Sequence, residues 1–299
     1  RQALLDKLNS LLGGEPVPTP FWAVLIFSDI AMLEILVGEA EKSTFFLQFT
    51  MHACAALPLV WQQRLPQRPR SADSESFVSS SSHNSLNKSI RDKVIERDNE
   101  QCVITKNNPI EVAHIYPHYL LSGARTNLAR TFPPFWEMLK YFWSEERVSQ
   151  WHSQVFQDSE SPEKQFDSVG NQICLSPSIH ALWSLGRVAF WPLDYNDEKT
   201  TLEVEWHWQP PPPTSMDKTI AVNTVPSSSR GLNERSNPNS TASLSFIEQN
   251  GLARRIQTGD RFMLQTTDPR RLPLPSKELL DMQFVLNRIV NMSGAGDFE

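Results

Sequence analysis

The sequence predicts an α+β fold with a helical N-terminal region, a central unit of two short strands and a helix, and a helical insertion in that unit. Three observations predict this class. Apolar residues recur at helical spacing near the N-terminus. Short apolar runs bounded by turn residues occupy the middle of the chain. Two Pro- and Ser-rich segments separate these parts. With 299 residues, 39% of them hydrophobic, the chain can bury a large core.

Residues 1–62 are expected to form a helical region that packs against the rest or dimerises. The run at 21–37 is the most apolar of the chain, and we expect it to form one helix, followed by a second over 39–62. Asp29 and Glu34 would each cost about 2.5–3.5 kcal/mol near the centre of a bilayer. The run therefore favours a buried helix, or the seam of a homodimer formed through 21–62, over a membrane span.

Composition divides the rest of the chain. Residues 63–86 are a Ser-rich linker, and 87–208 are expected to be the folded core, with a helical insertion at 123–166. Residues 209–243 open with a four-proline run and continue in small polar residues, which predicts a disordered loop. Residues 244–299 are expected to complete the core domain.

The net charge and the cysteine content argue against several classes of function. The net charge of −6 is not typical of a dedicated nucleic-acid binder, so such binding would need a local basic face. The three cysteines form no CxxC pair, which argues against a zinc ribbon and a disulfide framework. The N-terminal residues are amphipathic and lack the long apolar stretch of a cleavable signal. We expect a reducing compartment, cytoplasmic or nuclear.

The first half of the central unit carries a histidine at the end of a strand. Residues 102–104 and 111–115 are expected to be two strands of a hairpin, joined by the turn-rich TKNNP. A helix over 87–99 precedes them. The hairpin would present His114 at the end of its second strand.

The second half carries another histidine on a helix. Residues 173–175 are short and apolar, and Ser176 followed by Pro177 is typical of a helix start. His180 then falls in the first turns of the helix, which Gly186 ends. Asn171 lies in the turn before the strand, nine positions before His180.

This order of strand, strand and helix, with His, Asn and His in sequence, resembles the HNH endonuclease family, whose core is the ββα-metal motif. It is similar in particular to a large fungal group of that family. The resemblance rests on CVIT at 102–105, AHIYP at 113–117, Asn171 with Leu175, and His180 with Trp183, Gly186 and Arg187. A further resemblance lies at 258–289.

The resemblance implies hydrolysis of phosphodiester bonds in nucleic acids. His114 would be the general base that takes a proton from the attacking water, because the pKa of histidine suits this role near neutral pH. His180 would bind a divalent metal ion that neutralises charge on the phosphate. Asn171 would orient the base or assist the site. Mg, Mn, Ni and Zn ions are not distinguished by this pattern.

One departure from the family concerns the metal. Many members carry an acidic or histidine ligand directly before the first histidine, where this chain has Ala113. Glu111 shares a strand face with Ala113 rather than with His114. His118 is the other alternative ligand, and the sequence does not choose between Glu111 and His118.

The insertion contains an aromatic-rich stretch at 134–157, expected to be one helix. It either packs in the core or forms an apolar wall beside His114, and such a wall would suit a small organic substrate better than a duplex. Trp136 in this helix, together with Trp183 and Arg187, is expected to bind substrate. The other basic residues near the site are Arg125 and Arg130.

Two alternatives to a nuclease follow. One is a repurposed enzyme that uses acid–base chemistry on a small organic substrate, as in specialised metabolism. The other is a non-catalytic scaffold that dimerises through its N-terminal helices. The acidic net charge, Ala113 and the aromatic insertion favour the repurposed enzyme over the nuclease, whereas the family resemblance favours the nuclease. The intact His114, Asn171 and His180 oppose the scaffold.

Overall fold

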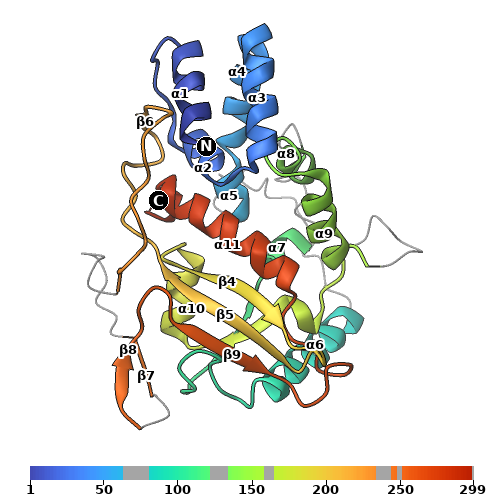
Figure 1. The fold of residues 1–299 in the computed structure, drawn as a ribbon. Coiled ribbons are helices and arrows are strands. Elements are labelled where there is room, and N and C mark those ends of the chain that lie inside the picture. Colours follow the sequence, from blue (N-terminus) through green and yellow to red (C-terminus); the bar gives the residue numbers. More distant parts are fainter. Residues whose placement is uncertain (63–80, 122–133, 158–164, 234–243, 248–250, 298–299) are drawn as a thin grey trace, which may run out of the picture.

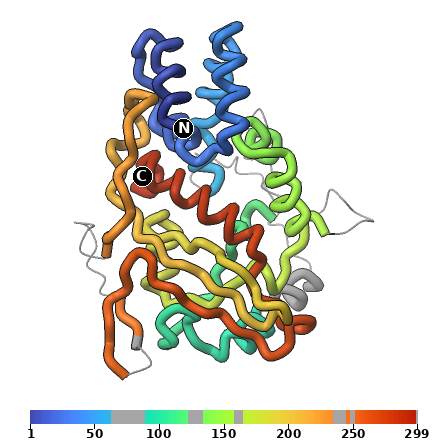
Figure 2. Tube along the Cα trace, in the orientation of Figure 1, coloured from blue at the N-terminus to red at the C-terminus, as the bar shows by residue number. Residues whose placement is uncertain are grey.

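Helices and antiparallel strands are combined in the protein, as the predicted α+β class requires. The computed structural model describes residues 1–62, 81–121, 134–157, 165–233, 244–247 and 251–297, with the backbone alone for 81–88. Figure 1 shows three tiers: N-terminal helices, the long helix α11 (Lys277–Met292), and a three-stranded sheet beneath it. Figure 2 follows the chain from the blue N-terminal helices to the red α11, which packs on α2 and α5.

The N-terminal region contains five helices: α1 (Gln2–Leu11), α2 (Thr19–Phe27), α3 (Ile30–Lys42), α4 (Thr44–Cys54) and α5 (Leu57–Trp61). The single helices expected over 21–37 and 39–62 are therefore wrong. The first breaks at Asp29, whose backbone is extended and whose N–H donates to the carbonyl of Phe142. The second breaks at Ser43, whose hydroxyl caps the start of α4. Polar contacts at both breaks replace those of a continuous helix.

Among the described residues, one segment, Thr44–Trp61, is long and apolar enough to cross a membrane, judged by length and composition alone. In the structure 39% of this segment is buried. It is divided between α4 and α5. In α5, Leu57 and Trp61 are buried, and the Trp61 indole donates to Asn287 of α11 at 2.9 Å. Partly buried core helices pass the same test, so absence of membrane contact stays a prediction.

The predicted hairpin of 102–104 with 111–115 is wrong. Strand β2 (Glu111–His114) pairs antiparallel with β3 (Gln172–Leu175) instead, with His114 opposite Gln172. Residues 102–107 close on themselves, because the N–H of Cys102 donates to Asn107 and the N–H of Lys106 donates back to Cys102. The N–H of Val103 donates to the carbonyl of Cys174 in β3, so the backbone groups of this segment bond their own loop and β3 rather than 111–115.

Helices flank this strand pair on both sides. They are α6 (Ser81–Arg97), which starts before the expected 87, α7 (His118–Leu121) after β2, the short 3-10 helix η2 (Val169–Asn171) before β3, and α10 (Pro177–Ser184) after it. Arg97 at the end of α6 is buried and donates to the carbonyls of Val169 and Gln172 at 2.9 and 2.7 Å. Its guanidinium also pairs with Asp98, whose carboxylate accepts from the N–H of Cys174 at 2.9 Å. These bonds tie the end of α6 to β3.

The insertion contains two helices, α8 (Phe135–Leu139) and α9 (Glu145–Val155), rather than one helix over 134–157. Ser144 separates them: its hydroxyl accepts from Arg147 and caps α9, while its own N–H donates to Asp29. Of the segment predicted as the insertion, 123–133 and 158–164 lie outside the described residues.

The main sheet has the order β4 (Val188–Tyr195), β5 (Thr201–Trp208), β9 (Arg261–Gln265), all antiparallel. Alternate residues of β5 are buried, as in a sheet covered on one face. Helix α11 packs against β4 and is followed by the 3-10 helix η4 (Ala295–Asp297). A separate hairpin joins β7 (Ser245–Ile247) and β8 (Ala253–Arg255).

The described part of the predicted disordered loop at 209–243 is a strap over the N-terminal helices. Its strand β6 (Thr219–Ile220) pairs with β1 (Val17–Pro18), and its Val222 is fully buried. The indole of Trp22 donates to the carbonyl of Thr224 at 3.0 Å. The prolines restrict the backbone to extended conformations and thereby lower the entropic cost of this packing. Residues 234–243 lie outside the described residues.

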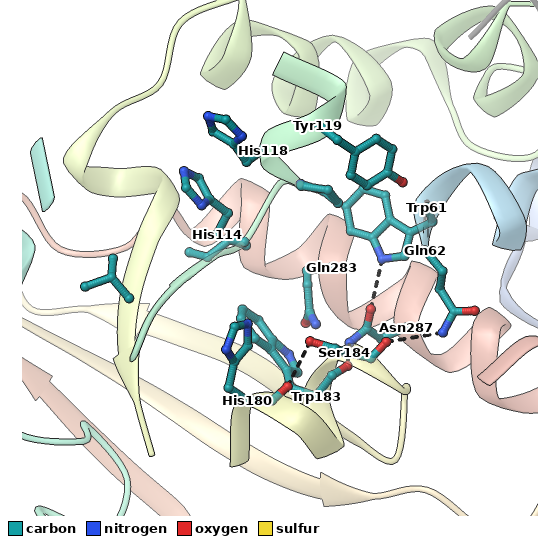
Figure 3. A pocket seen from close by; sticks show the side chains of 13 residues that line it. Trp61, Gln62, His114, His118, Tyr119, His180, Trp183, Ser184, Gln283 and Asn287 are labelled. Atoms are coloured by element: carbon teal, nitrogen blue, oxygen red, sulfur yellow. Dashed lines mark hydrogen bonds between the residues drawn. The ribbon is translucent and has the colours of Figure 1, made fainter. Parts of the chain in front are cut away.

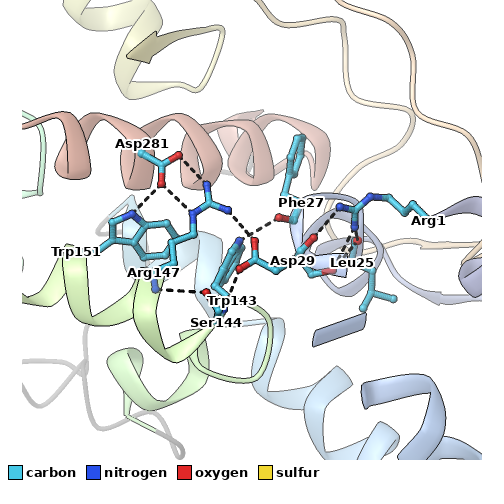
Figure 4. A network of polar contacts seen from close by, with 10 residues as sticks. Arg1, Leu25, Phe27, Asp29, Trp143, Ser144, Arg147, Trp151 and Asp281 are labelled. Atoms are coloured by element: carbon cyan, nitrogen blue, oxygen red, sulfur yellow. Dashed lines mark hydrogen bonds and ion pairs between the residues drawn. The ribbon is translucent and has the colours of Figure 1, made fainter. Parts of the chain in front are cut away.

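A three-way ion pair joins the N-terminal helices, the insertion and α11 (Figure 4). Arg147 of α9 binds Asp281 of α11 through two bonds of 2.9 and 2.7 Å and binds Asp29 at 2.8 Å. The indole of Trp151 donates to the same Asp281 carboxylate at 2.9 Å. Burial alone would lower the pKa of Arg147, but the two carboxylates outweigh it and raise this pKa.

We expect Arg147→Met to lower the free energy of unfolding by about 2–3 kcal/mol. The substitution leaves two carboxylates, each about three-quarters buried, without their cation. The expected loss of stability is smaller than for a fully buried pair, because the remaining exposure lets water screen these charges. Urea denaturation measures the change. Lys42→Met, which breaks the exposed pair with Glu39, is the control and should leave the midpoint unchanged. Equal midpoints for all three proteins would contradict a structural role of this ion pair.

Candidate functional site

A cavity of about 620 Å³ lies where β2, α7 and α10 meet α5 and α11 (Figure 3). Its walls contain three histidines and several aromatic and carboxamide side chains. The lining residues are Trp61, Gln62, Val112, His114, Ile115, Pro117, His118, Tyr119, His180, Trp183, Ser184, Gln283 and Asn287. This size is typical of small-molecule pockets.

His114, at the end of β2, is held by a carboxylate. Its Nε2 lies 2.9 Å from Oδ2 of Asp167 and 3.1 Å from Nε2 of Gln172. A carboxylate partner favours the proton on Nε2, which leaves the lone pair of Nδ1 as the basic position. The His114 side chain is 23% exposed, so the imidazole is fixed in place but accessible.

The hydrogen bonds around Asp167 favour its ionised form. Its carboxylate accepts hydrogen bonds from the side chains of His114, Gln172 and Asn171 and from the backbone N–H of Ser168. Burial alone would raise the pKa of Asp167, but the contacts with His114, Asn171 and Ser168 outweigh it and hold this pKa below its ordinary value. A carboxylate at this place orients the His114 imidazole.

Asn171 clamps the backbone that follows His114. Its side chain accepts from the N–H of Tyr116 at 2.7 Å and donates to the carbonyl of Tyr116 at 3.2 Å. Its own carbonyl accepts from Ile115 at 2.8 Å. Asn171 is buried, with 2% of its surface exposed, so these bonds are shielded from water. The residue therefore fixes the backbone that directly follows His114.

His180 has its own carboxylate partner. Ser176 caps α10 by accepting from the N–H of Ile179, which places His180 in the first turns of the helix. Nδ1 of His180 lies 2.6 Å from Oε2 of Glu111, which leaves Nε2 as the other nitrogen able to bind a ligand. Glu111 shares a strand face with buried Ala113, as the sequence indicates, and that face lies toward α10.

His118 belongs with His114 rather than with His180. The centroids of the His114 and His118 rings are 5.0 Å apart. Burial, and secondly the neighbouring His114, lower the pKa of His118, which favours its neutral form. The two alternative ligands from the sequence therefore lie beside different histidines: Glu111 contacts His180, and His118 contacts His114.

The structure brings most of the predicted site residues to one place. His114, His118, His180 and Trp183 line the same cavity, and Asn171 holds its edge. Two further predicted residues do not line it, and two lie outside the described residues. Trp136 packs against Tyr116, His152 and Phe156; Arg187 is buried in contact with Asn291 and Asp297; Arg125 and Arg130 are not described.

Sequence reasoning missed Asp167, Gln283 and Trp61. Asp167 lies four positions before Asn171, and an acidic residue just ahead of the motif was the available signal. Gln283 and Trp61 come from α11 and α5, far from the motif in sequence. No local pattern marks such residues, because only the packing of distant helices brings them to the cavity.

The donor atoms allow a test of whether a metal ion fits. Among the described residues, no three His, Cys, Asp or Glu side chains come close enough to hold one ion. Glu111 occupies Nδ1 of His180, so the two residues offer a metal ion the single nitrogen Nε2, which does not suit a closed tetrahedral zinc site. An ion held there would take its remaining ligands from water and substrate phosphate.

The segment that contains these histidines is similar to a known protein family. Residues 102–190 match the family model described as HNH endonuclease. The match supports an HNH endonuclease domain in this segment, and members of that family generally use a divalent metal ion. No curated protein and no solved structure matches the chain. Trp61, Gln62, Gln283 and Asn287 of the cavity lie outside the matched segment.

We expect Asn171→Ala to destabilise the protein by about 1–3 kcal/mol, because it leaves the buried N–H and carbonyl of Tyr116 without partners. Hydrogen exchange at the amides of Ile115 and Tyr116 should accelerate. Asn223→Ala removes an exposed contact with Asp6 and serves as the control. Unchanged exchange at both amides would show that Asn171 does not hold this loop.

Proposed function

We propose that the protein hydrolyses phosphodiester bonds of nucleic acid at the cavity between β2 and α10. The observation that carries the proposal is the pairing of His114 with Asp167 at the edge of this cavity, inside a segment of the HNH endonuclease family. We assign β2, β3 and α10 as the two strands and the helix of the family's ββα motif, because β2 and β3 are paired and α10 follows directly.

His114 acts as the general base in this mechanism. Its Nδ1 takes a proton from the water whose oxygen attacks phosphorus, and Asp167 stabilises the imidazolium that forms. The P–O bond to the departing sugar oxygen then breaks, and that oxygen takes up a proton. Asn171 contributes by holding the loop after His114, so it is a positioning residue.

His180 and Glu111 serve the phosphate side of the reaction. His180 presents Nε2, and Glu111 fixes the ring through Nδ1, the arrangement typical of a metal-binding histidine. His180 would hold a divalent ion, which when bound neutralises negative charge on the phosphate oxygens. Because the protein supplies so few ligands, we expect weak binding.

The residues that line the cavity favour a second candidate function. No lysine or arginine of the described residues lines the cavity, whereas Trp61, Tyr119 and Trp183 do. This lining suits acid–base catalysis on a small organic molecule, with His114 as the catalytic group. The two functions differ in their substrate, and hydrolysis of a phosphodiester separates them.

We expect His114→Ala to abolish hydrolysis of bis(4-nitrophenyl) phosphate and single-stranded DNA, and Asp167→Asn to slow it by roughly 100-fold or more. The loss in Asp167→Asn follows because a neutral amide no longer stabilises the imidazolium. Initial rates across pH measure both. His152→Ala, a histidine packed on Phe156 outside the cavity, is the control and should keep full activity. Equal rates in all variants would reveal a contaminating nuclease.

We expect His180→Ala to weaken Mn²⁺ binding at least tenfold, because the metal-facing nitrogen is lost. Isothermal titration calorimetry, with paramagnetic broadening of histidine resonances as a second readout, measures it. His114→Ala should bind Mn²⁺ as the unchanged protein does. Loss of binding in His114→Ala, with retention in His180→Ala, would move the metal to the other histidine.

A further inference from the structure

We propose that the cavity beside His114 binds one unpaired nucleobase, whose hydrogen-bonding edge is recognised by the carboxamide of Gln283. The inference rests on the proposed function and names its substrate class: single-stranded nucleic acid, or a nucleotide-sized phosphodiester, rather than a duplex. Figure 3 shows Gln283 extending from α11 toward the centre of the cavity, between His114 and Trp183.

Gln283 has hydrogen-bonding capacity that the protein does not use. The residue is 2% exposed, and its Oε1 has no hydrogen-bond partner among the described residues. Buried polar atoms in proteins are almost always paired, because an unpaired one costs free energy. A bound ligand with an N–H group would satisfy Oε1.

The carboxamide of Asn287 contrasts with that of Gln283. Asn287, one turn further along α11, accepts from the Trp61 indole at 2.9 Å and donates to the carbonyl of Trp183 at 2.6 Å. The side chain of Gln62 donates to the carbonyl of Ser184 at 3.2 Å, while its Oε1, like that of Gln283, has no partner among the described residues. These bonds fix the walls of the cavity to one another. Gln283 is therefore a recognition group in a site whose shape is already set.

The walls suit a flat, uncharged ring. The Trp61 and Trp183 indoles and the Tyr119 phenol line the cavity, and aromatic side chains stack on nucleobases with little dependence on sequence. No charged side chain other than the histidines lines it among the described residues, so its polar recognition comes from neutral groups. The Trp183 indole Nε1 is another buried atom without a partner among the described residues. A nucleobase edge offers both donors and acceptors to such groups.

The position of the subsite fixes which nucleic acid can use it. His114 lines the same cavity, so a base bound there places its own phosphodiester beside the general base. In a duplex each base is paired and stacked, and it would have to leave the helix to enter. Four cavity residues from outside the family segment, at 61, 62, 283 and 287, complete the subsite and thereby set this preference.

The test compares binding of thymidine 5′-monophosphate with that of 2-deoxyribose 5-phosphate, which lacks the base, by titration calorimetry and tryptophan fluorescence. We expect the nucleotide to bind and the base-free sugar phosphate to bind at least about tenfold more weakly. Gln283→Leu should weaken nucleotide binding by about tenfold or more, because the base edge loses its partner. Gln150→Leu, an exposed residue of α9 that does not line the cavity, is the control and should bind normally.

Gln283→Glu keeps the shape of the side chain and guards against misfolding of the leucine variant; it should also weaken binding. Equal affinity for the two ligands, or normal nucleotide binding by both Gln283 variants, would overturn the subsite. His114→Ala should retain nucleotide binding while it loses hydrolysis. Nucleotide binding without hydrolysis of bis(4-nitrophenyl) phosphate by the unchanged protein would instead reject the proposed function and leave the subsite standing.

Discussion

The clamp between Asn171 and Tyr116 is the contact on which the site depends. The two residues are separated by 55 positions, yet they exchange two side-chain hydrogen bonds and lie beside the β2–β3 pair. The same carboxamide bonds Asp167, which in turn holds His114. One buried asparagine thus joins the strand, the loop and the Asp167 carboxylate. A shift of this side chain would move every group that orients the imidazole.

A second constraint surrounds the first. Helix α11 packs on the sheet, on α5 and on α9, and its Asp281 receives Arg147 while its Asn287 receives Trp61. The ion pair lies where the N-terminal helices meet α9 and α11, and its charges favour this pairing of helices. Apolar packing supplies most of the stability. The cavity wall at Gln283 lies between these two contacts on the same helix, so its position follows from both.

The sequence predicts those features whose cause is local. His114, Asn171 and His180 are found because strand, turn and helix signals place them, and Ser176 with Pro177 marks the start of α10. The predictions fail where distant groups compete. Asp29 breaks the helix at 21–37 because it bonds residues of the insertion. Residues 102–104 leave the predicted hairpin because their backbone bonds their own loop and Cys174 of β3 instead. Partners such as Asp167 cannot be assigned without the fold.

The charge of the chain and the chemistry of the cavity are consistent with each other. A net charge of −6 provides no general attraction for a polyanion, so a nuclease of this composition must gain affinity from contacts of short range. Stacking and carboxamide hydrogen bonds are of that kind, and they depend little on salt. A weakly held metal ion would add attraction at the scissile phosphate alone. Substrate selection then depends on the nucleobase bound beside His114, because the electrostatic field of the protein surface contributes little to the binding of nucleic acid.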